Sequence, residues 1–334
     1  MATAQRDTDR SVAAVDFLKV TEQAAIESAR WLGRGDNHSA DQAAVDAMRA
    51  ALGQMPITGT VVIGEGQKDE APELYVGEVL GRGGMECEIA VDPLEGTDLV
   101  ARGDSGAVAI CAIGEPGGLM PAPDIYMQKL VVGATVKGHV DIQAPIAETL
   151  DIVARCYGRA VRDTTTIVLD RPRHAELIEE IRAAGARIRL IPDGDITASL
   201  SVAVRGTGDH LYVGMGGSTE GVITAAALEC LGAEIQARMA PRHDDDRARM
   251  ADFGMADDDR VMGTRDLPVP AVRHRDRRHG RQPAAGRAVL RRRRPHPLDR
   301  DGPGGQHGAL HRYRAPAEPG DHPRDPSLVG EHSE

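Results

Sequence analysis

The chain has 334 residues and a formal net charge of −11 at neutral pH. This acidic balance argues against a general nucleic-acid binder, because the nucleic-acid backbone attracts basic surfaces. The four cysteines are scattered without a CxxC pair, which is typical of ordinary thiols in a reducing compartment. The N-terminus has no apolar leader segment and no apolar run reaches the length of a membrane span, so we predict a cytoplasmic location and no membrane partner.

The N-terminal part, 1–155, is predicted to place helices on a mostly antiparallel sheet. Apolar residues near helical spacing predict helices over 15–32 and 40–52. Ser39 and Gln42 have the spacing of a capping box at the start of the second helix. Short apolar runs punctuated by glycine and proline predict strands at 60–63, 87–91, 107–113 and 126–132.

The next part, 156–267, shows a different rhythm, in which strands alternate with helices. We predict strands at 166–169, 187–191, 210–213 and 233–239, and helices at 174–184, 196–204 and 219–231. This alternation indicates right-handed βαβ crossovers and a parallel sheet. The fold class is therefore mixed α/β. Polar groups that follow successive parallel strands should share one rim of the sheet, where ligands bind.

The string DPLEGT (92–97) follows the apolar run 87–91 and is the strongest chemical signal. Proline sets the direction in which the chain leaves the strand, and Gly96 allows a tight turn. Asp92, Glu95 and the Leu94 carbonyl can then face one point, and such oxygen ligands suit Mg²⁺ or Mn²⁺. Taken alone, the string also fits an acidic surface turn, although the metal site is the favoured interpretation.

Further carboxylates stand at the ends of neighbouring predicted elements. Glu65 lies between two glycines after the run 60–63, with Asp69 and Glu70 just beyond it. Asp41 opens a predicted helix, where it could simply match the helix dipole. Three separate element ends that each present a carboxylate favour a metal centre, although Asp69 and Glu70 also fit solvated surface charge.

Seven strings together resemble a known family. They are GRGD-x-x-x-AD (33–41), VVIGEGQKDEAP (61–72), VDPLEGT (91–97), PDIYMQKLVVG (123–133), RPRHAELI (171–178), IPDGD (191–195) and GMGGSTEG (214–221). From about residue 20 to about 267 the chain resembles class II fructose-1,6-bisphosphatase, within the lithium-sensitive, metal-dependent sugar phosphatases. DPLEGT is common to that superfamily, whereas GEG, RPRH and DGD in this order are more specific.

The resemblance implies a phosphoric monoester hydrolase of gluconeogenesis that converts fructose 1,6-bisphosphate to fructose 6-phosphate. It also implies a homo-oligomer and two or more Mn²⁺ or Mg²⁺ ions. The implied metal ligands are Asp41, Glu65, Asp92, Glu95, Glu220 and the carbonyl of Leu94. Thr97 would orient the attacking water, and Asp69 would act either as a general base or as a hydrogen-bond partner of a metal ligand.

The implied substrate-binding residues are Glu95, Gly96, Thr97, Tyr126, Arg171, Pro172, Arg173, Asp193, Gly194, Asp195 and Gly217. Arg171 and Arg173 would clamp the distal phosphate, and Pro172 would keep the segment extended so that both point to one side. Asp193 and Asp195 would accept hydrogen bonds from sugar hydroxyls, and Tyr126 would also hydrogen-bond the substrate. The amides of Gly216, Gly217 and Ser218 precede a predicted helix and could hold an anion.

Three alternatives stay open from the residues alone. DGD also fits a β-turn, and Glu220 also fits a charge in the first turn of a helix. The superfamily string also allows an inositol monophosphatase or a nucleotide phosphatase. One departure concerns Asn37, where the family has a lysine in GRGDK, so a cation beside the phosphate is missing unless His38 or Lys68 replaces it.

The composition changes after Leu267. Residues 268–334 contain 14 of the arginines, 10 of the 20 prolines and 7 of the 12 histidines, but no isoleucine or phenylalanine. Such a segment cannot bury enough apolar surface to offset the entropy of ordering it, so we predict a disordered tail that supplies no strand. An inactive chain whose arginine-rich tail binds nucleic acid is the third functional alternative.

A frameshift explains this tail better. With suitable third bases, a one-nucleotide shift turns 273–301 into VTGIDGTDGSLLRGVRFFGGGARTHSIVM. The shifted string resembles the C-terminal part of the same family, which has a TG-x-T-D-G-x-LL run and a THS-x-VM run. We therefore interpret 268–334 as an aberrant tail whose departure begins near Leu267.

Overall fold

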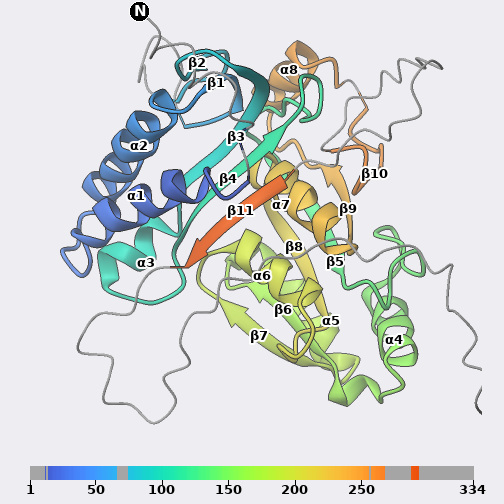
Figure 1. The fold of residues 1–334 in the computed structure, drawn as a ribbon. Helices are drawn as coiled ribbons and strands as arrows, with labels where there is room; N and C mark the ends of the chain where they lie inside the picture. The colour runs from blue at the N-terminus through green and yellow to red at the C-terminus, as the bar shows by residue number, and fades with distance from the viewer. Residues whose placement is uncertain (1–11, 13, 66–73, 256, 268–286, 293–334) are drawn as a thin grey trace, which may run out of the picture.

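The structure is a computed structural model that describes residues 12, 14–65, 74–255, 257–267 and 287–292, the last of these by their backbone. Figure 1 shows two sheets and the helices packed on them. Within the described residues, no helix is both long enough and apolar enough to cross a membrane. The mixed α/β fold predicted from the sequence is confirmed.

The first sheet has the strand order β11-β4-β3-β1-β2. Its strands are β1 (Ile57–Ile63), β2 (Val79–Leu80), β3 (Met85–Glu95), β4 (Val108–Gly114) and β11 (Arg287–Arg292). Only β1 and β3 pair in parallel, and the other neighbours are antiparallel. The helices beside it are α1 (Leu18–Ala29), α2 (Asn37–Gly53) and α3 (Thr97–Arg102). This is the predicted helix-covered, mostly antiparallel part.

The second sheet has the order β10-β9-β5-β8-β6-β7. Its strands are β5 (Tyr126–Val132), β6 (Thr165–Leu169), β7 (Arg187–Ile191), β8 (Leu211–Gly217), β9 (Glu234–Met239) and β10 (Met262–Gly263). The three strands β7, β6 and β8 are parallel, as their alternation with helices predicts, and the sheet continues antiparallel through β5, β9 and β10.

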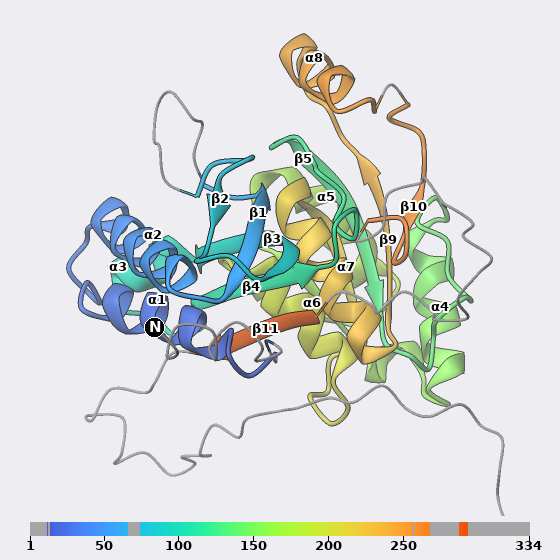
Figure 2. The same ribbon diagram turned by 45° about the horizontal axis from the view of Figure 1, so that its top comes forward.

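The connecting helices of this part are α4 (Ile146–Cys156), α5 (Ala175–Ala183), α6 (Asp195–Ala203), α7 (Ser218–Leu231) and α8 (Asp244–Asp252), with 3₁₀ turns η1 (Val161–Asp163) and η2 (Pro172–His174). One apolar core joins α6 and α7 to facing residues of both sheets. Helices α1 and α2 share a second core with the first sheet, and α4 and α5 share a third with the second sheet. The layers therefore run helix, sheet, helix, sheet, helix, as the rotated view in Figure 2 also shows.

The placement of β5 differs from the prediction. The run 126–132 was expected in the first sheet, but β5 lies inside the second, between β8 and β9. Tyr126 pairs with Gly217, and Met127 pairs with Met239. Local periodicity marks a strand without specifying its partners, which here lie far away in the sequence. The two sheets thus divide between β4 and β5, before residue 155.

The start of α2 is also corrected. The helix begins at Asn37, with Asp36 as its N-cap, instead of at a capping box headed by Ser39. The Asp36 carboxylate accepts hydrogen bonds from the Ser39 amide at 2.9 Å and from the Ser39 hydroxyl at 2.7 Å. An aspartate in the extended conformation satisfies the first free amides of the helix and so fixes its start one turn earlier.

The tail contributes one strand, so the expectation that it supplies none is wrong at 287–292. Strand β11 pairs antiparallel with β4 along its whole length, from Arg287 opposite Ile113 to Arg292 opposite Val108. Figures 1 and 2 show it at the edge of the first sheet. The free edge of β4 offers a row of backbone donors and acceptors, which a segment with the short apolar centre Ala-Val-Leu can satisfy. The remaining tail residues lie outside the described part of the chain.

Candidate active site

The predicted rim of the second sheet exists. Arg171 and Arg173 follow β6, Asp193 and Asp195 follow β7, and Gly217 ends β8. These are the carboxyl ends of three parallel neighbours. Tyr126 begins the antiparallel strand β5 and therefore joins the same rim, opposite Gly217. Parallel-strand geometry alone brings these groups together, as the sequence indicated.

The predicted metal ligands come from four elements. They lie on α2 (Asp41), at the end of β1 (Glu65), at the end of β3 (Asp92, Leu94 and Glu95) and in the first turn of α7 (Glu220). Glu95 and Leu94 are buried, whereas Asp41, Asp92 and Glu220 are half-buried. Because α7 packs between the sheets, it presents Glu220 to the carboxylates of the first sheet.

The electrostatics show that these carboxylates affect one another. Burial, then the charges of Glu65, Glu95, Glu220 and Asp41, raise the pKa of Asp92 well above its usual value. Burial of the carboxylate, followed by the charges of Asp41, Glu220 and Asp124, raises the pKa of Glu65 to about 8. The Glu65 residue as a whole is nevertheless exposed to solvent. Burial also raises the pKa of Asp41. Asp92 is thus the carboxylate that interacts with all four others.

The side chains are not arranged as a finished ligand shell. Among the described residues, no three His, Cys, Asp or Glu side chains lie close enough together to hold one metal ion. The donor set nonetheless fits divalent cations, because these ions prefer carboxylate and carbonyl oxygens and because the charges of the four neighbouring carboxylates disfavour ionisation of Asp92.

Glu95 links the two halves of the molecule. Its carboxylate accepts hydrogen bonds from the Ile196 amide at 2.6 Å and the Thr197 amide at 3.3 Å, in the first turn of α6. Burial, then the Asp195 charge, raise the pKa of Glu95, while these two amides oppose that rise. The first amides of a helix favour negative charge, so they stabilise this carboxylate in a buried place. The sequence did not reveal this contact, which joins residues about a hundred positions apart.

Lys129 forms a buried ion pair with Asp195. The Lys129 side chain is fully buried, and its Nζ lies 2.7 Å from Asp195 Oδ2. The Tyr212 hydroxyl lies 3.4 Å from the same oxygen. Asp195 Oδ1, by contrast, is buried without a hydrogen-bond partner among the described residues. A buried acceptor without a partner is costly, so a hydrogen bond to this oxygen would be favourable.

The glycines of GMGGSTEG make room for these charges. A Cβ at Gly216 would come 1.9 Å from Asp195 Oδ2 and 3.2 Å from Lys129 Nζ. A Cβ at Gly217 would come 1.9 Å from Glu220 Oε2. The sequence suggested that amides here hold an anion, but the Ser218 amide donates to the Ile125 carbonyl at 2.9 Å and is therefore occupied. The absence of a side chain at Gly216 and Gly217 allows Asp195 and Glu220 to pack closely against the backbone.

The arginines after β6 are arranged differently from the prediction. Pro172 begins the 3₁₀ turn η2, and only Arg171 is extended, with φ −136° and ψ 143°. The expectation that Pro172 keeps the segment extended is therefore wrong, because proline also suits the first turn of a helix. Arg171 Nη2 lies 4.0 Å from Asp193 Oδ1. Arg173 donates to the Met215 carbonyl from Nε at 3.2 Å and from Nη2 at 2.9 Å.

The other predicted residues are placed as follows. Gly96 has φ 87°, a left-handed conformation that suits glycine, and it caps α3, whose first residue is Thr97. Gly194 caps α6 with φ 91°. The Asn37 amide donates to Asp98 Oδ1 at 3.0 Å, and the side chain of His38 is exposed. Asp69, Glu70 and Lys68 lie outside the described residues.

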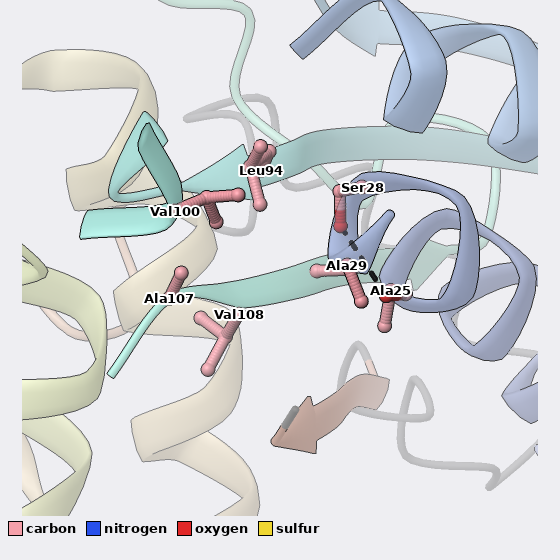
Figure 3. A pocket seen from close by; sticks show the side chains of 8 residues that line it. Ala25, Ser28, Ala29, Leu94, Val100, Ala107 and Val108 are labelled. Atoms are coloured by element: carbon pink, nitrogen blue, oxygen red, sulfur yellow. Dashed lines mark hydrogen bonds between the residues drawn. The ribbon is translucent and has the colours of Figure 1, made fainter. Parts of the chain in front are cut away.

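A small apolar cavity lies between α1 and the ends of β3 and β4, against the side chain of Leu94 (Figure 3). Its lining includes Ala25, Leu94, Val100 and Val108, and its volume is about 10 Å³. That space is about one water molecule, far below what a ligand pocket needs. We therefore regard it as a packing defect.

The fold and these side chains define a class of protein. A layered α/β chain that gathers carboxylates beside an arginine-bearing rim has the components of a phosphate-ester site, in which cations and guanidinium groups meet an anionic ligand.

Comparison with known proteins narrows this class. Residues 11–271 match the family described as bacterial fructose-1,6-bisphosphatase, glpX-encoded. The chain belongs to this family. The resemblance found in the sequence is confirmed, and the family match ends just after the point where the composition of the chain changes.

Similar proteins carry a double name. A class 2 fructose 1,6-bisphosphatase/sedoheptulose 1,7-bisphosphatase of Synechococcus sp. (strain JA-3-3Ab) is 46% identical over 278 residues, which cover 76% of this chain and 80% of the relative. The protein of the same name from Trichodesmium erythraeum is 44% identical, covering 77% and 82%. That from Synechocystis sp. is 47% identical over 242 residues, covering 69% and 70%.

Proposed function

We propose that this chain hydrolyses the 1-phosphate of fructose 1,6-bisphosphate, giving fructose 6-phosphate and phosphate. Family membership supports the reaction class. The single observation that carries the proposal is the Glu95 carboxylate bound by the first amides of α6, because it fixes the acidic cluster against the rim that bears the arginines. A bisphosphate needs these two kinds of site, one for the phosphate that reacts and one for the phosphate that stays.

The metal-binding residues in this proposal are Asp41, Glu65, Asp92, Glu95, Glu220 and the carbonyl of Leu94. Mn²⁺ or Mg²⁺ bound there would neutralise phosphoryl oxygens and lower the pKa of a water molecule. Thr97, in the first turn of α3, would orient the attacking water with its hydroxyl, and Asp69 would accept a proton from that water.

The substrate-binding residues lie on the rim. Arg171 and Arg173 would hold the distal phosphate, and Tyr126, whose ring lies beside Arg173, would donate a hydrogen bond. Asp195 Oδ1 lacks a partner among the described residues and would accept a hydrogen bond from a sugar hydroxyl. Asp193 and the Gly194 backbone would line the same side of the sugar as Asp195. We infer that the chain works as a cytoplasmic homo-oligomer in gluconeogenesis.

The double name of the relatives favours a second substrate. Sedoheptulose 1,7-bisphosphate is also a ketose phosphorylated at both ends, so a distal-phosphate clamp would accept it. Inositol monophosphates and mononucleotides have no second phosphate for such a clamp, which disfavours those alternatives.

The clamp gives the proposal its test. Arg171→Ala and Arg173→Ala are each expected to raise the KM for fructose 1,6-bisphosphate by roughly tenfold or more, because a charge-assisted hydrogen bond to phosphate is lost. Hydrolysis of p-nitrophenyl phosphate should be unchanged, since that ester has no distal phosphate. Arg187→Ala is the matched control, because Arg187 pairs with Asp163 at the opposite end of the same sheet. Steady-state phosphate release measures all four proteins, and equal losses on both esters would refute the clamp.

A further inference from the structure

Two arginines, Arg173 and Arg242, lie over the ring of Tyr126, and only Arg173 belongs to a motif found in the sequence. The guanidinium carbon of Arg173 lies 4.8 Å from the centroid of the Tyr126 ring, and that of Arg242 lies 4.1 Å from it. Arg173 comes from η2, after β6, whereas Arg242 comes from the turn between β9 and α8. Two elements from different parts of the sheet therefore bring like charges to one ring.

The backbone around Arg242 is held in place. The Ala240 amide donates to the Tyr126 carbonyl at 2.9 Å, which continues the pairing of β9 with β5. The Arg242 amide donates to Asp246 Oδ2 at 2.8 Å, and Pro241 restricts the residue before it. This turn thus directs Arg242 from the end of β9 toward the rim that also bears Gly217.

The positive charges at the Tyr126 ring favour the binding of an anion there. Asp244, Asp245 and Asp246 occupy the first turn of α8, yet the Arg242 guanidinium lies over Tyr126, and no ion pair engages it in the part of the chain that the structure describes. Stacking of an exposed arginine on an aromatic ring is only weakly favourable, and two guanidinium groups on one ring repel each other. A dianion that contacts both guanidinium groups would offset that repulsion.

We propose that Arg242 is a further substrate-binding residue, which holds the sugar phosphate that is not hydrolysed together with Arg173, across the ring of Tyr126. The inference rests on the proposed function, because it assumes a phosphorylated sugar at this rim. The phosphate would be gripped from two elements, and the clamp would recognise the terminal phosphate of a ketose bisphosphate.

Arg242→Gln in the full chain tests this directly. Its affinity for fructose 6-phosphate, measured by calorimetry in EDTA, is expected to fall about tenfold, as is expected for the loss of one charged contact to phosphate. The KM for fructose 1,6-bisphosphate should rise by a similar factor with kcat within about twofold and p-nitrophenyl phosphate hydrolysis unchanged. Arg187→Gln is the control, since it removes an exposed arginine at the far end of the sheet.

The outcomes separate this inference from the proposed function. Unchanged fructose 6-phosphate affinity and KM in Arg242→Gln would overturn the inference, and so would an equal loss on the simple ester. Absence of fructose 6-phosphate binding by the unaltered chain would overturn it too. Binding that depends on Arg242, in a chain that never hydrolyses the bisphosphate, would support the inference and refute only the proposed function.

The double variant adds a check on shared contact. If Arg173 and Arg242 bind one phosphate, the loss in Arg173→Ala/Arg242→Gln should be smaller than the product of the two single losses. A loss equal to the product would show independent sites and count against the shared clamp.

Discussion

Replacing Lys129 by methionine is expected to lower the free energy of unfolding by about 3–5 kcal/mol, the usual cost of leaving one partner of a buried ion pair uncompensated. Lys129 Nζ lies 2.7 Å from Asp195 Oδ2, and neither side chain is more than 6% exposed. Without the ammonium, the Tyr212 hydroxyl at 3.4 Å is the one remaining partner of that oxygen among the described residues. Urea denaturation at neutral pH measures the loss.

The double variant Lys129→Met/Asp195→Asn is the control for this prediction. In the double variant, Asp195→Asn removes the charge that Lys129→Met leaves unpaired. It should therefore regain part of the lost stability, while substrate binding stays impaired. If Lys129→Met unfolds within about 0.5 kcal/mol of the unaltered chain, as surface substitutions do, the buried pair is not what holds the rim together.

Replacing Asp92 by asparagine should move activity and stability in opposite directions. In the presence of Mg²⁺ or Mn²⁺ we expect kcat to fall on the order of a hundredfold or more. The loss of a metal ligand should lower activity at least as much as the loss of a residue that hydrogen-bonds such a ligand. In EDTA we expect the melting temperature to rise, since burial and four neighbouring carboxylates disfavour the Asp92 charge and raise its pKa. Asparagine keeps the shape and removes that charge.

Asp98→Asn is the matched control for this variant. Asp98 lies further along the chain, in α3, and its carboxylate accepts a hydrogen bond from Asn37 at 3.0 Å. It should lose little activity and gain no stability in EDTA. A fall in melting temperature for Asp92→Asn would mean that the carboxylates are not in electrostatic conflict, and would remove the reason to place cations among them.

The sequence predicted those parts of the site that strand order determines. Arg171, Asp193 and Gly217 follow neighbouring parallel strands, and the alternation of strands and helices was enough to place them on one rim. Asp92 and Glu95 were found because Pro93 and Gly96 suggested a turn after the apolar run 87–91, although β3 in fact continues through the proline to Glu95. In each case a short segment carries its own signal.

The missed features depend on contacts between distant segments. The strand pattern of 126–132 did not show that β5 belongs to the second sheet, and therefore did not place Lys129 beside Asp195. Nothing local to Glu95 announces the amides of α6. The one available signal was a lysine in the apolar strand YMQKLVV, since a lysine is seldom fully buried without a charged partner.

The tail remains the least ordinary part of the chain. The family match ends at residue 271, which agrees with our interpretation of a frameshift near Leu267. Strand β11 occupies 287–292. In the shifted reading, the β-prone run RGVRFF covers 285–290 and so overlaps this strand. Backbone pairing tolerates many side chains, so a strand can survive at an edge even where the residues change.

The measurement that tests the account most directly is phosphate release from fructose 1,6-bisphosphate by the full chain, first in excess EDTA and then with increasing free Mg²⁺ or Mn²⁺. The account predicts no release above the uncatalysed rate in EDTA, and a saturable rise with metal that yields fructose 6-phosphate. Equal release with and without EDTA would contradict it, because the acidic cluster would then have no part in the reaction.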